Sequence, residues 1–169
     1  LAAMTIDSGG LIYIAGTTNS VDLPVTDRGF QQGNAGALDV FVAWFDPSQN
    51  GRLSLLYATY MGGAGIDQAG GIAVLDRKIY VTGSTLSDNF PVANAFVPVH
   101  NGARDIFVAE IDPEKSGSAS LVASTYFGGS GTDYGRAIAV DAPGHVYVAG
   151  ITYSPDLPVS TNAYQSNYG

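Results

Sequence analysis

The sequence predicts an all-β protein made of repeated four-stranded units, and three observations support this. A block of about 66 residues recurs along the chain, each copy contains four apolar runs of strand length, and helical periodicity is missing throughout. The composition agrees, because 22 glycines and 10 tyrosines favour turns and strands. With 46% hydrophobic and only 13% charged residues, the chain does not have the composition of a disordered protein.

The repeat is clearest in three segments that each end in glycine: Ile12–Gly16, Ile79–Gly83 and Val146–Gly150. Their last residues stand at positions 16, 83 and 150, a step of 67 residues each time. A second pair of segments, Asp39–Ala43 and Asp105–Ala109, recurs at a step of 66. The step changes by one residue inside predicted loops, which is where insertions are tolerated.

Four strands are expected in each copy. The first covers 3–7, 70–75 and 136–141, the second 11–18, 78–85 and 145–152, the third 39–46 and 105–112, and the fourth 53–61 and 119–127. Tight turns join the first strand to the second, at Gly9-Gly10, Asp76-Arg77 and Pro143-Gly144. The link from third to fourth strand opens with Asp-Pro and contains Gly51 or Gly117, which are residues that favour turns.

The strands are apolar on both faces. In the third strand, Phe41, Ala43 and Phe45 alternate with Val40, Val42 and Trp44. A sheet with one face in water would alternate apolar and polar residues, whereas burial of both faces favours four-stranded blades stacked around an axis, a β-propeller. A solenoid would use a shorter repeat, and a sandwich would not need units this alike.

The chain therefore divides into about two and a half blades. The first covers about 3–61, the second about 70–127, and half of a third about 136–152, followed by a loop at 153–169. Propellers close with at least about four blades, so we expect other blades, from the same or neighbouring chains, as partners. The sequence opens at Leu1 without a start methionine or signal peptide, which suggests an internal piece of a longer protein.

Several classes of function are not expected. The seven basic residues form no cluster in a chain of net charge −8, so nucleic-acid binding is not predicted. No apolar run has the roughly 20 residues that cross a bilayer, so no membrane-spanning segment is expected. We predict no enzymatic activity and no cofactor other than a candidate calcium ion, because His100 and His145 lack partner motifs and neither a Gly-x-Ser-x-Gly elbow nor a phosphate-loop lysine occurs.

A candidate calcium site lies between the fourth strand of one copy and the first strand of the next. Residues 62–67 and 128–133 read Gly-Gly-x-Gly-x-Asp, the opening of the calcium-binding nonapeptide, with Asp67 and Asp133 as candidate ligands. Calcium requires several oxygen ligands, and here the motif occurs once per copy rather than in tandem. The alternative is a tight turn in which each aspartate caps backbone amides.

A second candidate site is the long loop between second and third strands, about 19–38 and 86–104. Loops of some twenty residues are often functional, and this one is expected to emerge at the same end as the glycine-rich loop. Alternatively, its repeated apolar residues fold back over the blade ends. The candidate contacts for a sugar or peptide in these loops and the last one are Phe30, Gln31, Phe96, His100, Asn101, Arg104, Tyr164 and Gln165.

The third copy resembles a known repeat. It reads Tyr-Phe-Gly-Gly-Ser-Gly-Thr-Asp at 126–133, Ala-Ile-Ala-Val-Asp at 137–141, Val-Tyr-Val-Ala-Gly at 146–150 and Asn-Ala-Tyr-Gln at 162–165. These segments resemble the SBBP repeat, the seven-bladed β-propeller repeat, although Leu23 and Leu157 stand where that family has an aromatic residue before proline. The resemblance implies a propeller in large secreted or surface proteins of prokaryotes, and it implies no common reaction.

The function expected from these observations is that of a non-enzymatic extracellular or cell-surface module, a structural scaffold and binding platform for protein or carbohydrate. Two alternatives stay open at this stage. The chain could be a building block of a larger extracellular assembly or filament, because an incomplete blade leaves an open strand edge. It could also be part of a propeller enzyme whose catalytic residues lie in other blades.

Overall fold

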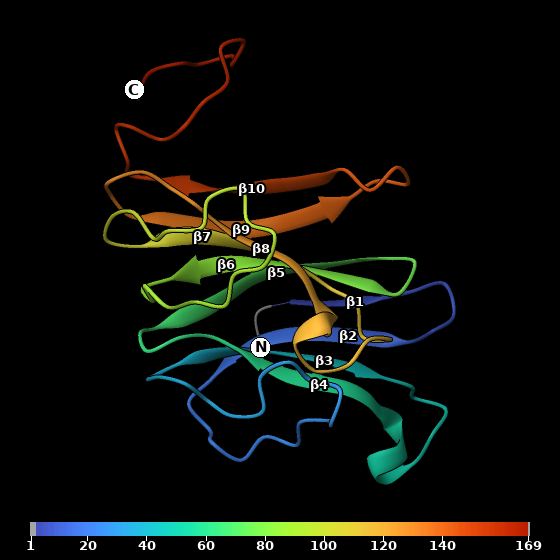
Figure 1. The fold of residues 1–169 in the computed structure, drawn as a ribbon. Coiled ribbons are helices and arrows are strands. Elements are labelled where there is room, and N and C mark those ends of the chain that lie inside the picture. Colours follow the sequence, from blue (N-terminus) through green and yellow to red (C-terminus); the bar gives the residue numbers. More distant parts are fainter. Residues whose placement is uncertain (1–2, 169) are drawn as a thin grey trace.

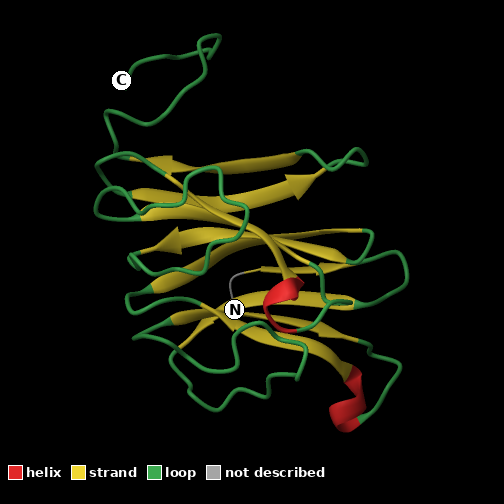
Figure 2. Ribbon diagram, in the orientation of Figure 1, coloured by secondary structure: helices red, strands yellow, loops and turns green. Residues whose placement is uncertain are grey.

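The computed structural model describes residues 3–168 and places their ten strands in three antiparallel sheets. Two short 3₁₀ helices, η1 (Gly51–Ser54) and η2 (Gly117–Ser120), are the helices of this region (Figure 2). The first sheet contains β1 (Ala3–Ile6), β2 (Ile12–Thr18), β3 (Asp39–Phe45) and β4 (Leu55–Met61); the second contains β5 (Asp67–Leu75), β6 (Lys78–Thr85), β7 (Asp105–Ile111) and β8 (Leu121–Phe127); the third contains β9 (Asp133–Val140) and β10 (Val146–Thr152).

Each sheet is a simple meander in which strands that follow one another in the chain are hydrogen-bonded neighbours. The three sheets lie on one another as layers (Figure 1), with β5 packed against β1 and β2, and β9 packed against β5 and β6. This confirms the predicted all-β class and the four-stranded antiparallel units. None of the helices in residues 3–168 has the length and hydrophobicity needed to cross a membrane.

The hydrophobic core lies between the layers. In β3, Val40, Val42 and Trp44 are buried, while the alternate residues Phe41 and Phe45 are only partly covered. Tyr13 stacks on Trp44 with ring centroids 5.8 Å apart, and in the second sheet Phe90 stacks on Phe107 at 4.6 Å. Because the large side chains of one sheet meet the next sheet rather than water, face-to-face stacking explains why these strands are apolar on both faces.

The first strand of the second and third copies begins earlier than the apolar runs predict. The sequence places it at 70–75 and 136–141, but β5 begins at Asp67 and β9 at Asp133. Pairing of β5 with β6 continues past the glycines through a bulge between Ala69 and Gly71, which a pattern of apolar residues does not reveal. The expected loop residues Asp67 and Asp133 are therefore the first residues of strands.

Candidate functional site at the sheet junctions

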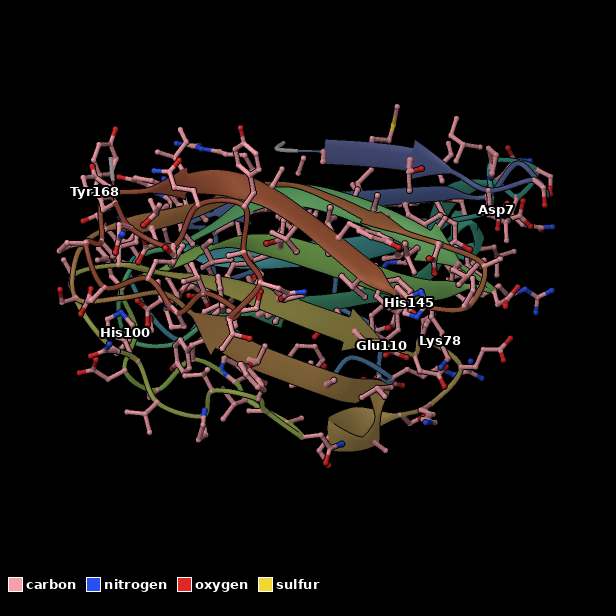
Figure 3. The ribbon with its side chains drawn as sticks, turned by 90° about the horizontal axis from the view of Figure 1, so that it is seen from above. Asp7, Lys78, His100, Glu110, His145 and Tyr168 are labelled. Atoms are coloured by element: carbon pink, nitrogen blue, oxygen red, sulfur yellow. The ribbon has the colours of Figure 1, made fainter. Side chains whose placement is uncertain are left out.

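The long loops and the glycine-rich loops gather at one end of the molecule. Figure 3 shows His100 and Tyr168 at this end, and Asp7, Lys78, Glu110 and His145 at the opposite end, where the short turns lie. The β2–β3 and β6–β7 loops carry most of the candidate contacts, and the β4–β5 and β8–β9 loops lead from one sheet to the next. This end therefore contains both candidate sites of the sequence.

Four consecutive backbone amides of the β4–β5 loop donate to side chains, and these side chains come from both adjoining sheets. Two of the acceptors lie in the β6–β7 loop of the next repeat, so the loop is clamped between consecutive sheets. The bonds run from Gly62 N to Gln31 Oε1 (3.0 Å), Gly63 N to Asp67 Oδ2 (2.7 Å), Ala64 N to Asn89 Oδ1 (2.8 Å) and Gly65 N to Ser87 Oγ (2.8 Å).

The β8–β9 loop repeats this arrangement almost atom for atom. Its amides donate from Gly129 to Asp133 Oδ2 (2.9 Å), from Ser130 to Asp156 Oδ1 (2.8 Å) and from Gly131 to Ser154 Oγ (2.9 Å). A Cβ on Gly63 would lie 2.7 Å from Ser87 Cβ, and one on Gly129 would lie 2.6 Å from Ser154 Cβ. Glycine is required at this position because the neighbouring loop presses directly on the backbone.

The same junctions bring aspartates together in pairs. Leu38 and Ile66 form a parallel β-bridge between the start of β3 and the start of β5, so the next residues, Asp39 and Asp67, lie side by side. In-register residues of parallel neighbours point to the same face, and both side chains are fully buried. The bridge between Arg104 and Thr132 places Asp105 beside Asp133 in the same way.

Each aspartate uses one carboxylate oxygen and leaves the other without a partner. Asp39 Oδ2 accepts hydrogen bonds from Ala35 N (2.7 Å) and Gln31 Nε2 (3.0 Å). Asp67 Oδ2 accepts from Gly63 N (2.7 Å) and Ser87 Oγ (2.8 Å). The Oδ1 atoms of all four paired aspartates are buried and have no hydrogen-bond partner among residues 3–168.

Burial changes the acidity of one member of each pair. Burial raises the pKa of Asp39 above its ordinary value, the hydrogen bond from Ala35 opposes this rise, and the charge of Asp67 adds to it. Burial also raises the pKa of Asp105, while the hydrogen bond from Asn101 and the nearby His100 lower it and Asp133 raises it. The protonated form of each of these two aspartates is therefore favoured.

The candidate contacts of the long loops divide into packed and exposed residues. Phe30 packs against the core, and Gln31 belongs to the junction, where it also donates to Gly33 O. Phe96 is 82% exposed and Tyr164 is fully exposed, so both rings project into solvent. Gln165 donates to Asn167 O within the last loop.

The three non-repeated candidates surround the second aspartate pair. Asn101 donates its backbone N–H to Asp105 Oδ2 (2.7 Å). His100 Nδ1 lies 2.8 Å from Asp88 Oδ1, and with 8% of its side chain exposed the imidazole is largely covered rather than a free surface group. Arg104 donates to Gln68 (3.2 Å) and Ser84 (3.1 Å) and lies over the ring of Tyr134.

The residues near Asp67 and Asp133 offer few free ligands for a metal. No group of three or more histidine, cysteine, aspartate or glutamate side chains converges within residues 3–168. The carbonyl oxygens of Gly65 and Ile66 already accept backbone hydrogen bonds from Ala37 and Leu86. Calcium binding at Asp67 and Asp133 stays a prediction, and Asp39 and Asp105 join them as the acidic neighbours that such an ion would meet.

Several residues of the junction are not evident from the sequence as members of one site. Asp39 and Asp105 stand out as repeated residues at the start of a strand, but nothing in the sequence makes them neighbours of Asp67 and Asp133. The serines that bind the paired aspartates, Ser87 and Ser154, are not evident either. A signal for them exists, because Ser20, Ser87 and Ser154 keep the same step of 67 residues as the repeat.

Stacked four-stranded meanders joined by glycine-rich crossings define a protein built from blades like those of a β-propeller. Residues 124–158 match the family model of SBBP, the beta-propeller repeat. The match includes the crossing loop between β8 and β9 and both strands of the third sheet, so the chain contains an SBBP repeat at this junction. A search of curated proteins found no significant match to the chain.

Proposed function

We propose that the chain is a non-enzymatic scaffold module of an extracellular or cell-surface protein, with a binding platform at the loop end. The interlocked junction, repeated twice, is the observation that carries this proposal. Most polar side chains at this end hold loops together, since Gln31, Ser87 and Asn89 bind backbone amides. A rigid end built in this way suits presentation of loop tips rather than chemistry.

The loop tips offer exposed aromatic rings. Phe96 and Tyr164 occupy equivalent places in successive copies, and both side chains are open to solvent. Exposed aromatic rings stack on sugar faces and on apolar groups of proteins, and they lose little conformational freedom in doing so. A carbohydrate or protein surface is therefore the class of ligand that these tips suit.

A glycan array together with a pull-down from surface extracts tests this proposal. We expect binding that falls at least about tenfold in the Phe96→Ala variant, because one stacking contact is worth about 1.5 kcal/mol. Val21→Ala is the matched control, since Val21 is also an exposed apolar loop residue, and it should bind as the unchanged chain does. A chain with no ligand in either screen, or equal loss in both variants, would contradict the platform.

Assembly through the last strand is a second candidate, favoured by one specific observation. Among residues 3–168, β10 pairs with β9 alone, whereas β2 and β6 each have a neighbour on both edges. In both complete sheets the strand that follows places its aspartate opposite a threonine, Asp39 opposite Thr18 and Asp105 opposite Thr85. The open edge of β10 would take a strand in this register, with its aspartate opposite Thr152; a chain that stays monomeric and well folded at high concentration would exclude assembly of copies.

A further inference from the structure

The paired aspartates present an electrostatic problem. Asp39 and Asp67 are side by side and fully buried, and no lysine, arginine or histidine among residues 3–168 forms an ion pair with either of them. Two uncompensated carboxylates in a buried site repel each other and have lost their hydration, which is unfavourable by several kcal/mol in a typical interior. A positive group must therefore accompany each pair.

The two carboxylates of a pair are close enough to share such a group. A Cβ on Gly62 would lie 2.5 Å from Asp39 Oδ1 and 2.9 Å from Asp67 Oδ2, so both oxygens border the same small volume. In the second pair, a Cβ on Gly128 would likewise meet Asp105 Oδ1, and it would lie 2.8 Å from Asp133 Oδ2. The same contact at two junctions indicates a regular feature of the repeat.

The hydrogen bonds of the first pair leave room for one more donor. Each Oδ2 atom already accepts two bonds, and each Oδ1 atom accepts none. One proton between the two carboxyl groups gives one of them an O–H donor and the other an acceptor, which satisfies both orphaned oxygens. A metal ion would need about six oxygen ligands, whereas only two acidic side chains converge at each junction in the described residues.

We propose that each aspartate pair, Asp39 with Asp67 and Asp105 with Asp133, shares one proton at neutral pH and so forms a carboxylic acid–carboxylate hydrogen bond. This bond ties the third strand of one blade to the first strand of the next. The proton resides on Asp39 and on Asp105, whose protonated forms burial favours. Asp67 and Asp133 carry the negative charge, which the serine hydroxyl and the loop amide stabilise.

Other titratable groups bear mainly on the second pair. His100 acts on Asp105, and His100 itself lies against Asp88. The phenol of Tyr126 senses Asp67, Asp88 and Asp105, and burial together with these charges raises its pKa to about 12, so it stays neutral throughout the relevant range. The first pair has no such histidine beside it, which makes Asp39 the cleaner reporter.

The shared proton gives stability an unusual pH dependence. A native state that holds a proton on Asp39 and Asp105 binds more protons than the unfolded chain above the ordinary pKa of aspartic acid. The contribution of the pair is complete below that pH and is lost as the pH rises through the raised folded pKa. We therefore expect the urea midpoint of unfolding to fall between about pH 5 and pH 8, opposite to the usual behaviour of a salt-bridged aspartate.

Two measurements on the whole chain test the proposal. In a pH titration of chain labelled with ¹³C at aspartate carboxyls, two resonances should stay protonated while exposed aspartates ionise, and Asp39→Asn and Asp105→Asn should each remove one of them. The double variant should also flatten the urea midpoint between about pH 5 and pH 8, because asparagine keeps a donor without a charge. Asp27→Asn, at an exposed loop position, is the matched control and should leave the slope unchanged.

Each measurement can overturn the proposal. If every aspartate resonance of the unchanged chain titrates in the ordinary range, no shared proton exists, whatever the variants do. If millimolar calcium raises the urea midpoint of the unchanged chain at pH 7, and if chelator and the Asp39→Asn variant both abolish that rise, a cation rather than a proton occupies the pair. The titration of the unchanged chain needs no variant to fold, so it decides the question even where the asparagine variants do not fold.

Discussion

Replacing Gly70 by valine should lower the free energy of unfolding by about 3 kcal/mol. A Cβ at this position would fall on the carbonyl oxygen of Gly135 and lie 2.9 Å from the carbonyl carbon and 3.3 Å from Arg136 Cα. All of these are backbone atoms of β9, so they cannot rotate aside as a side chain can. The second and third sheets must therefore separate where their first strands cross.

Urea unfolding of Gly70→Val beside Gly33→Val measures this effect. A Cβ on Gly33 would meet nothing within 4 Å, so that variant carries the same side chain without the clash. It should differ from the unchanged chain by less than about 1 kcal/mol. Equal stability of the two variants would show that β5 and β9 do not approach as closely as the layered fold requires.

Replacing Tyr126 by phenylalanine should cost about 3 kcal/mol of stability, because two buried backbone groups lose their partner. The phenol of Tyr126 accepts a hydrogen bond from Phe90 N (3.0 Å) and donates one to Ser87 O (2.9 Å), and the side chain is buried. It thereby fixes the segment that presents Ser87 to the glycine-rich loop. The junction should loosen together with the sheet.

Thermal and urea unfolding of Tyr126→Phe test this expectation. Tyr60→Phe should have a smaller effect, since Tyr60 makes the equivalent bonds to Leu23 N and Ser20 O in a partly exposed setting. Tyr164→Phe is the control, because that side chain is fully exposed and its stability effect should be near zero. A Tyr126→Phe variant as stable as Tyr164→Phe would mean that the hydroxyl does not hold the loop.

Much of the fold could be predicted because strands repeat at a fixed step. The glycines at 16, 83 and 150 and the alternation around Phe41 locate strands without any knowledge of their neighbours. The start of β5 at Asp67 could not be located in this way, because it depends on a bulge and on a bridge to Leu38, 28 residues away from Ile66 in the chain. Long-range pairing leaves no local pattern of apolar residues.

The candidate site could be predicted only in part for the same reason. The glycine-rich motif indicated Asp67 and Asp133, but Asp39 and Asp105 come to lie beside them only when one sheet crosses onto the next. Equivalent positions also differ in their surroundings: Phe30 packs against the core, while Phe96 is exposed and Val97 packs there instead. A repeat therefore predicts where a residue lies along a blade better than what it contacts.

Disulfide trapping across the junctions tests the central claim most directly, since the chain contains no cysteine of its own. The bridged pairs Leu38 with Ile66 and Arg104 with Thr132 should each form a disulfide rapidly when replaced by cysteine, because bridge partners lie within its reach. The mismatched pair of Leu38 and Thr132 should not. Failure of both bridged pairs in a folded chain, or equal trapping of the mismatched one, would contradict stacked blades joined by paired aspartates.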